Sequence, residues 1–309
     1  MGNISTTLNR FRGNNAMDCD TTGNSTDHGT INGQDTISGS ESYGDEIKRK
    51  RDNILRVGFI NINGVPGYNE HCKNQEIYEA ISRMDPCIIG MTEMNRCWKH
   101  VHHGHRWNER IRGWWENYRS NISYNYKDCN NTSYQPGGNI LLSIGKPTFR
   151  IIAQGSDKKG LGRWCWTRYR GRHDITIRVI CAYRPCKPNI PGPNTTYSQH
   201  QRLFDMTNDN RCPRAAILED LEREMREWRE VDGDQIIMMM DCNENVNGAL
   251  IRSWLRDNSL HNMAEDIQTS TSHIPATQQR GSHPIDGIFI SNTISVVKGG
   301  FLPFGEFPF

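Results

Sequence analysis

Short apolar runs that end in polar residues are the feature that most constrains how this 309-residue chain can fold. From Ile54 onward, six such runs are typical of strands, and they cover residues 54–62, 87–92, 138–144, 174–183, 235–241 and 284–291. Several of them are apolar without alternation, which is typical of strands that are covered on both faces. The runs therefore predict a largely buried sheet structure.

Helical periodicity separates these predicted strands. Apolar residues recur three or four positions apart in three segments, marked by Ile77, Ile81 and Met84, by Leu218, Leu221, Met225 and Trp228, and by Ile251 and Leu255. Pro213 suits the first turn of the second helix because its missing N–H is not needed there. Alternating strands and helices predict one α/β domain over residues 54–309, with helices packed on sheet.

Residues 1–53 have a different composition, rich in Asn, Ser, Thr, Gly and Asp, without apolar periodicity. Such a segment buries too little apolar surface to offset the entropy of ordering it. We therefore expect a disordered polar tail whose deletion leaves the unfolding midpoint nearly unchanged. The tail ends in Lys48-Arg49-Lys50-Arg51, which indicates either a nuclear-import signal or a solvated charge run before the first strand.

The composition and the apolar runs of the sequence bear on where the protein is located. No apolar run approaches the roughly 18 residues of a transmembrane helix, and no secretory signal is recognisable. We expect an intracellular protein, with the nucleus as one option, that has no membrane contact and keeps its ten cysteines reduced. The net charge of +2 permits a polyanionic partner without requiring one.

Polar side chains stand where five of the predicted strands end or begin. They are Asn61, Asn63, Glu93, Tyr183, Asp241, Asn243 and Asp286. One strand-end Asp is usually a turn or a helix cap, but ligands in α/β folds gather where several strand ends meet. Carboxylate oxygens suit Mg²⁺ or Mn²⁺, and amides can bind phosphate oxygens. The set therefore predicts a site for a hard cation and a phosphate.

Five stretches of sequence resemble, in order and spacing, the motifs of the endonuclease/exonuclease/phosphatase superfamily. They are FININGV (59–65), IIGMTEMN (88–95), VICAYRP (179–185), IIMMMDCNENV (236–246) and QRGSHPIDGIFIS (279–291). The segments YRP (183–185) and PIDGIF (284–289) are most similar to those of the apurinic-type endonuclease domains of non-LTR retrotransposons. The resemblance implies a four-layer α/β sandwich, in which two packed mixed sheets are flanked by helices.

The resemblance also implies a mechanism. Glu93 would bind Mg²⁺ or Mn²⁺, helped by Asn61 or Asn63, and the metal would polarise the phosphoryl oxygen. The reaction would be hydrolysis of a phosphodiester in nucleic acid, with DNA as the expected substrate and a monomer as the expected state.

Four residues would carry the rest of that mechanism. Asp241 would hold or deprotonate the attacking water, while Asn243 and Tyr183 would hold the scissile phosphate. Asp286 would orient the histidine that acts on the phosphate or the water.

Three departures from the superfamily pattern bear on activity. Met240 stands where relatives have Gly, and we expect its side chain to crowd the site. Asn63 stands where relatives often have Asp, which would weaken metal binding modestly. After Asp286 the chain has no Ser-Asp-His motif, and His283 is too close in sequence to replace it. We therefore expect a truncated domain that lacks its last strand, leaves the edge of a central strand unpaired and has impaired activity.

Two other functions within the same fold stay open. One is a catalytically inactive domain that keeps nucleic-acid binding. The other is a phosphatase acting on inositol phosphates or lipids, which the absence of a secretion signal and of a membrane-binding stretch disfavours.

Segment 96–119 combines four tryptophans with arginines and permits two interpretations. Aromatic side chains among cations can stack on bases and follow phosphates. Alternatively, the tryptophans pack on the sheet as the apolar face of a helix.

Overall fold

The computed structural model describes residues 3–9, 43–45, 49–67, 70–129, 133–187, 192–267, 274–278 and 281–303. These residues form two mixed sheets. The larger sheet has the order β2-β13-β1-β3-β4-β6-β5, with β1 Asn3–Asn9, β2 Tyr43–Gly44, β3 Leu55–Asn61, β4 Ile88–Thr92, β5 Tyr118–Ser123, β6 Asn139–Ile144 and β13 Ser295–Leu302. The smaller sheet has the order β11-β12-β10-β9-β8-β7, with β7 Ile151–Ser156, β8 Trp164–Arg170, β9 Thr176–Tyr183, β10 Gln235–Asp241, β11 Leu260–Asn262 and β12 Asp286–Ser291.

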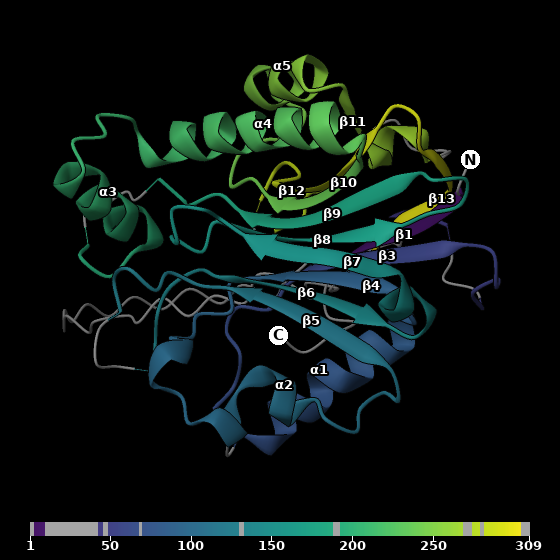
Figure 1. Cartoon of the computed structure of the whole chain (residues 1–309), viewed down its shortest axis with the longest axis horizontal. Coiled ribbons are helices and arrows are strands. Elements are labelled where there is room, and N and C mark those ends of the chain that lie inside the picture. The colour runs from purple at the N-terminus through teal and green to yellow at the C-terminus, as the bar shows by residue number, and fades with distance from the viewer. Residues whose placement is uncertain are drawn as a thin grey trace, which may run out of the picture.

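Helices cover the outer faces of the two sheets (Figure 1). The larger sheet carries α1 (His71–Met84) and the short α2 (Trp107–Arg110), and the smaller sheet carries α4 (Pro213–Asp232) and α5 (Ala249–Asp257). Helix α3 (Thr196–Met206) lies beside one end of the strands. Short 3-10 segments lie at Trp98–His100, His103–His105, Lys146–Arg150 and Met263–Asp266. The expected four-layer sandwich is confirmed.

Side-chain alternation along the strands builds the layers. In β3, Val57 and Phe59 point into the cluster between the sheets, while Ile60 packs on the opposite face with α1. In β10, Met239 joins the cluster between the sheets. Successive side chains of a strand point to opposite faces, so strands that are covered on both sides are apolar at every position, as the uninterrupted runs predicted.

Met240 lies on the far face of its strand from the predicted site. Its side chain is fully buried in the cluster that joins β10 to α4 and α5. The expectation that Met240 crowds the site is therefore wrong, because the residue next to Asp241 along a strand must point the other way.

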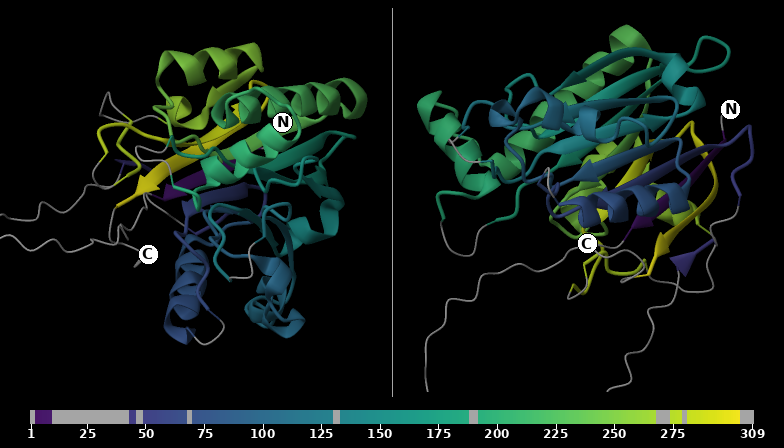
Figure 2. Two further views of the ribbon diagram at one scale, coloured as in Figure 1. Left: turned by 90° about the vertical axis from the view of Figure 1, so that its left-hand side faces the viewer. Right: turned by 90° about the horizontal axis from the view of Figure 1, so that it is seen from below.

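Strand β1 corrects the expectation for part of segment 1–53. Residues Asn3–Asn9 pair in parallel with β3 on one side and with β13 on the other, and Figure 2 shows the purple β1 beside the yellow β13. Strand β3 in the middle of the larger sheet therefore has a partner on both sides. Apolar periodicity in the sequence cannot predict such a strand. The hydrogen bonds to its neighbouring strands are made by backbone N–H and C=O groups, which nearly every residue carries.

Several sequence predictions lie outside the described residues. These include the rest of the tail at 10–42 and 46–48, with Lys48 of the basic run, and the last residues at 304–309. Lys50 of the same run donates a hydrogen bond to Asp85 Oδ1 at 2.8 Å. Nuclear import and the missing Ser-Asp-His motif stay predictions.

The tryptophans of segment 96–119 pack on the larger sheet. Trp98 and Trp107 are at most 3% exposed, and the rings of Trp114 and Trp115 lie 5.4 and 5.7 Å from the ring of Tyr78 on α1. The tryptophans therefore pack on the sheet as expected, but not as the face of one helix, because Trp98 lies in a 3-10 segment and Trp107 begins the four-residue α2. Their burial excludes base stacking on Trp98 or Trp107. No helix in the described part of the chain is both long enough and apolar enough to cross a bilayer.

Candidate active site

Strands of both sheets bring the predicted site residues to one end of the sandwich. In the larger sheet, Asn61 pairs in register with Thr92 at the ends of β3 and β4. In the smaller sheet, Asp241 lies between Tyr183 on β9 and Asp286 on β12. Three predicted residues therefore stand side by side on three neighbouring strands.

A hydrogen bond between the two sheets connects two of the predicted catalytic residues. Asn61 Nδ2 donates to Asp241 Oδ2 at 3.0 Å, and both side chains are buried. Asp241 Oδ1 accepts from the backbone N–H of Asn243 at 3.1 Å, and Asn61 Oδ1 accepts from that of Asn63 at 3.0 Å. Since a buried carboxylate is costly without such partners, these bonds fix the position of Asp241.

Four site residues have a backbone conformation that non-glycine residues seldom adopt. Asn63, Glu93, Asn95 and Asn243 have φ values of 43°, 53°, 51° and 46°. Each lies one to three residues after a strand end, so the chain turns sharply there and presents the adjacent side chains at the end of the sheet. Strained backbone of this kind concentrates at functional sites.

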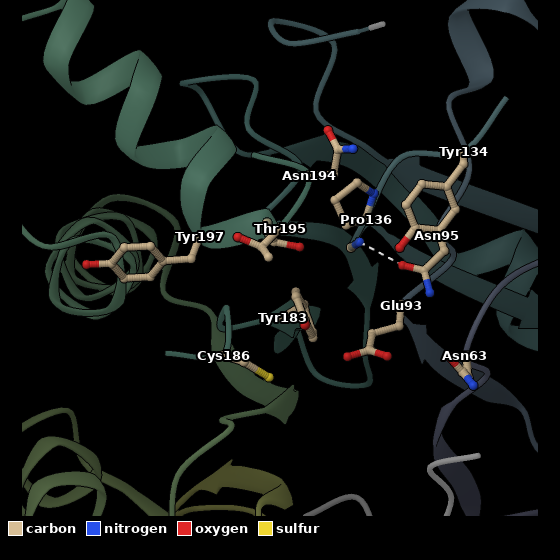
Figure 3. A pocket seen from close by; sticks show the side chains of 12 residues that line it. Asn63, Glu93, Asn95, Tyr134, Pro136, Tyr183, Cys186, Asn194, Thr195 and Tyr197 are labelled. Carbon is tan, nitrogen blue, oxygen red and sulfur yellow. Dashed lines mark hydrogen bonds between the residues drawn. The ribbon is translucent and has the colours of Figure 1, made fainter. Parts of the chain in front are cut away.

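Glu93 projects into a cavity of about 270 Å³ at this end of the sandwich (Figure 3). The described residues that line the cavity are Asn63, Glu93, Asn95, Tyr134, Pro136, Gly137, Tyr183, Cys186, Asn194, Thr195, Thr196 and Tyr197. The Gly137 N–H donates to Asn95 Oδ1 at 2.9 Å, and the Asn95 N–H donates to Gly137 O at the same distance. This pair of bonds joins the loop after β4 to the loop before β6.

The charge of Glu93 affects a neighbouring side chain in the cavity. The pKa of Tyr134 is raised from its ordinary value, first by burial and then by the negative charge of Glu93. Behind the cavity, Lys73 Nζ donates to Asn63 O at 3.4 Å, and burial lowers the pKa of this lysine. The site therefore combines one carboxylate in the cavity with one half-buried ammonium behind it.

The donor set fits a hard divalent cation. Mg²⁺ is commonly held by one or two carboxylates while keeping several waters, and Glu93 with the amide oxygen of Asn63 offers such a set in the cavity. Asn61 is less well placed as a ligand, because both ends of its amide are already hydrogen-bonded. Within the described ranges, no group of three or more His, Cys, Asp or Glu side chains is arranged around a common metal position.

Asn243 is held against the end of β9. Its Nδ2 donates to Arg184 O at 2.7 Å, and its Oδ1 accepts from Cys186 Sγ at 2.8 Å. Arg214 Nη2 donates to Asn243 O at 3.0 Å. In this arrangement the amide of Asn243 faces protein partners, whereas its backbone N–H holds Asp241.

The structure separates the predicted residues into two groups. Glu93, Asn63 and Tyr183 line the cavity, whereas Asn61, Asp241 and Asn243 form the bonded cluster beside it. Asp286 is buried next to Asp241, and its N–H donates to Thr277 Oγ1 at 3.1 Å.

His283 is exposed and bonds to Ser282 Oγ at 2.9 Å. It does not belong to the described lining of the cavity.

Sequence reasoning missed the wall of the cavity that α3 provides. Asn194, Thr195, Thr196 and Tyr197 form this wall, and the Thr195 hydroxyl accepts the Ser198 N–H as the cap of α3. A run of Asn and Thr after Pro193 is a helix-start signal that could have located α3. Nothing in that run indicates that it faces Glu93.

Comparison with known proteins supports the fold. No protein-family model matches the sequence, and no curated protein matches it. The catalytic domain of human Nocturnin with bound sulfate is 13% identical, with 75% of this chain and 80% of that chain covered and a TM-score of 0.51. An endonuclease/exonuclease/phosphatase family protein from Bacteroides thetaiotaomicron is 14% identical, with coverage of 76% and 82% and a TM-score of 0.46. An AP endonuclease from Archaeoglobus fulgidus is 14% identical, with coverage of 77% and 86% and a TM-score of 0.46. Of these three structures, only Nocturnin has a TM-score above 0.5. At 13% identity, this similarity supports the fold of the chain and gives no information about its activity.

Proposed function

We propose that this chain is a divalent-cation-dependent phosphodiesterase that acts on nucleic acid, as retroelement endonucleases do. One observation carries the proposal. The 3.0 Å bond between Asn61 and Asp241 joins the two sheets directly beside the cavity that holds Glu93 and Tyr183. A buried, fixed carboxylate next to a carboxylate in an open cavity suits phosphoester hydrolysis, which needs a water-holding group and a cation-binding group close together.

Each residue then has a defined task. Glu93 and Asn63 would hold Mg²⁺ or Mn²⁺, which when bound polarises a phosphoryl oxygen. Asp241, fixed by Asn61 and by the N–H of Asn243, would orient the attacking water and accept its proton. The hydroxyl of Tyr183 would donate to a non-bridging oxygen of the phosphate.

Two residues receive revised roles in this proposal. Asn243 becomes a positioning residue for Asp241, because its amide is bonded to Arg184 and Cys186. Asp286 would act through its neighbour Asp241 on the adjacent strand. DNA remains the expected substrate.

An inactive nucleic-acid-binding domain is the second candidate. One observation favours it, since the described residues that line the cavity include no histidine to act as the general acid or base. Binding of plasmid without cleavage in the assay below would support this candidate.

Nicking of supercoiled plasmid tests the proposed activity. The full chain with Mg²⁺ should convert supercoiled to open-circular DNA, and EDTA should stop the conversion. Asp241→Ala should reduce the rate at least about a hundredfold, because it removes the water-orienting group. Equal nicking by the parent and by Asp241→Ala would disprove the assignment of the site.

Thermal unfolding with and without Mg²⁺ tests the metal site. Binding to the folded state raises the unfolding temperature by mass action, so Mg²⁺ should stabilise the parent and should not stabilise Glu93→Gln. Glu79→Gln is the matched control, because Glu79 is an exposed residue of α1 that bonds to Gln75. If Glu93→Gln responds to Mg²⁺ like the parent, the cation is bound elsewhere.

A further inference from the structure

The loop that follows β4 and the segment that precedes β6 pair as a short antiparallel ladder. The Cys97 N–H donates to Ser133 O at 2.9 Å, and the Gln135 N–H donates to Asn95 O at 3.4 Å. The side chain of Cys97 is fully buried. The ladder therefore fixes the backbone that carries this thiol.

Gln135 of the same ladder holds the segment of a second cysteine. Its Nε2 donates to Asp128 O at 2.9 Å and to Cys129 Sγ at 3.9 Å. The half-buried Cys129 also donates to Asn125 O at 3.1 Å. The thiols of Cys129 and Cys97 are hydrogen-bonded to each other. The side chains of the two cysteines therefore meet between the two loops.

Neighbouring groups respond to both sulfur atoms. The pKa of Tyr124 is raised first by burial, and then by the negative charges of Cys129 and Cys97. The pKa of Cys129 is raised to about 11, first by burial and then by its hydrogen bond to Cys97. Cys129 is therefore protonated at neutral pH, and it becomes more reactive as the pH rises, because the thiolate is the nucleophile.

We propose that Cys97 and Cys129 are a disulfide-forming pair, which a small-molecule disulfide such as oxidised glutathione converts into a cross-link between the two loops. Two cysteines can be bridged without a large backbone movement only when their side chains point towards each other, and this pair meets that condition. Both are free thiols in the structure. Neither lines the cavity, so the proposal is independent of the candidate active site.

Burial separates this pair from another pair of cysteines in the described part of the chain. Cys165 and Cys181 occupy paired positions of β8 and β9. Both are fully buried between the sheets, so a small-molecule disulfide does not reach either sulfur. Cys129 is half-buried, and it gives the oxidant access to the first pair.

The reaction is a thiol–disulfide exchange in two steps. Cys129 gives its proton to solvent, and its thiolate attacks one sulfur of oxidised glutathione, which breaks that S–S bond and releases one glutathione. Cys97 then loses its proton and attacks Cys129 Sγ, which releases the second glutathione. The two released thiolates take up protons from solvent. Two protein thiols are thus oxidised, and one glutathione disulfide is reduced to two thiols.

The cross-link closes a ring over residues 97–129. This ring contains α2 and β5, and β5 is the edge strand of the larger sheet. A disulfide restricts the unfolded chain, and the loss of entropy in the unfolded state stabilises the fold. We therefore expect the oxidised protein to unfold at a temperature at least about 5 °C above that of the reduced protein.

Peptide mapping of the full chain tests the pair. The reduced protein is incubated with a mixture of reduced and oxidised glutathione at about pH 8.5, where more thiolate forms, and is then blocked with N-ethylmaleimide. Trypsin places the two cysteines on different peptides by cleaving after Arg96, Lys99 and Lys127. The two peptides should be recovered as one linked species that dithiothreitol separates. Recovery of Cys97 with the blocking group, and of Cys129 with the blocking group or with glutathione, would overturn the proposal.

The unfolding temperatures of the oxidised and reduced forms give a second test. Oxidation should stabilise the parent, and this effect should be absent in Cys129→Ser, which replaces a half-buried side chain by one of similar size. Cys72→Ser is the matched control, because Cys72 is exposed on α1, and it should show the same stabilisation as the parent. Equal stabilisation of Cys129→Ser and the parent would overturn the proposal, because a different pair of cysteines would then be responsible.

Discussion

At the scale of single residues, Asp241 shows how local turns build this site. Its two carboxylate oxygens accept from Asn61 on another sheet and from the N–H two residues ahead. Asn61 uses its own oxygen in the same way, for the N–H of Asn63. Short polar side chains at strand ends commonly bond the backbone two residues on. The same Asx geometry that ends each strand thus fixes the residues that would carry the chemistry.

His200 is a buried titratable residue outside the candidate site, and it leads to a prediction about acid stability. It is 1% exposed, and its Nε2 lies 3.2 Å from Leu161 O. Burial, followed by the positive charge of Arg163, lowers the pKa of His200 to about 4, while Asp157 acts in the opposite direction. The folded state therefore keeps the ring neutral where the unfolded state would protonate it.

The resulting loss of stability has a defined pH window. Because the folded pKa is depressed, the contribution is complete above about pH 6.5 and is lost as the pH falls towards 4, by about 3 kcal/mol. Urea unfolding at several pH values should show that His200→Gln loses less stability over this window than the parent. Equal losses in the two proteins would mean that other groups cause the acid sensitivity.

The sequence located the strand ends that meet at one end of the sandwich, and the catalytic roles of their side chains stay predictions. Asn61, Glu93, Tyr183 and Asp241 each follow an apolar run, and the structure brings their strand ends together. The engagement of the Asn243 amide by Cys186 and Arg184 was beyond sequence reasoning. That contact depends on how two loops from different strands meet, and no local pattern encodes it.

At the scale of elements, the pairing of strand β1 leads to a prediction about the stability of the fold. A central strand uses backbone N–H groups on both sides of its ladder, and proline lacks this donor. Thr6 pairs with Val57 on β3 and with Gly299 on β13. Thr6→Pro should therefore lower the free energy of unfolding by roughly 2 kcal/mol, or several degrees in Tm.

Thr30→Pro is the matched control for this substitution. It makes the same change in segment 10–42, which its polar composition without apolar periodicity predicts to be disordered. Calorimetry or thermal circular dichroism should give an unchanged Tm for this control. The same Tm for Thr6→Pro would mean that residues 3–9 add nothing to stability and that the original expectation of a dispensable tail holds.

Strands that are buried on both faces and helices with periodic apolar residues could be predicted from the sequence. Other elements were missed. Strands β3, β4, β9 and β10 correspond to apolar runs, and α4 begins at Pro213 as expected. In contrast, β1 has few apolar residues, and its place depends on a partner strand almost 300 residues away. Pairing over such a separation depends on the whole sheet and leaves little local signal.

At the scale of the whole molecule, the fold brings the candidate catalytic groups together from two sheets. The larger sheet supplies Asn61 and Glu93, and the smaller sheet supplies Tyr183 and Asp241. The interface between the sheets is apolar behind them, with Phe59, Met239 and Val179 in one cluster. Rigid packing of that cluster would hold the 3.0 Å cross-sheet bond at a fixed length.

The side chains that line the cavity also allow a prediction of how fast the protein hydrolyses its substrate. The described residues that line the cavity supply a carboxylate, amides and phenols but no imidazole, and His283 lies exposed beside Ser282. A positioned general acid or base contributes on the order of 10²- to 10⁴-fold in rate.

We therefore expect slow hydrolysis of bis(p-nitrophenyl) phosphate that rises with added imidazole at constant pH and ionic strength. The rise should be absent in Asp241→Ala, because free imidazole can replace a missing proton donor but cannot orient the attacking water. Rapid hydrolysis that does not respond to imidazole would show that a group already in the protein transfers the proton. The hydroxyl of Tyr134, next to Glu93, would then be the first candidate, and Tyr134→Phe would decide it by its effect on kcat.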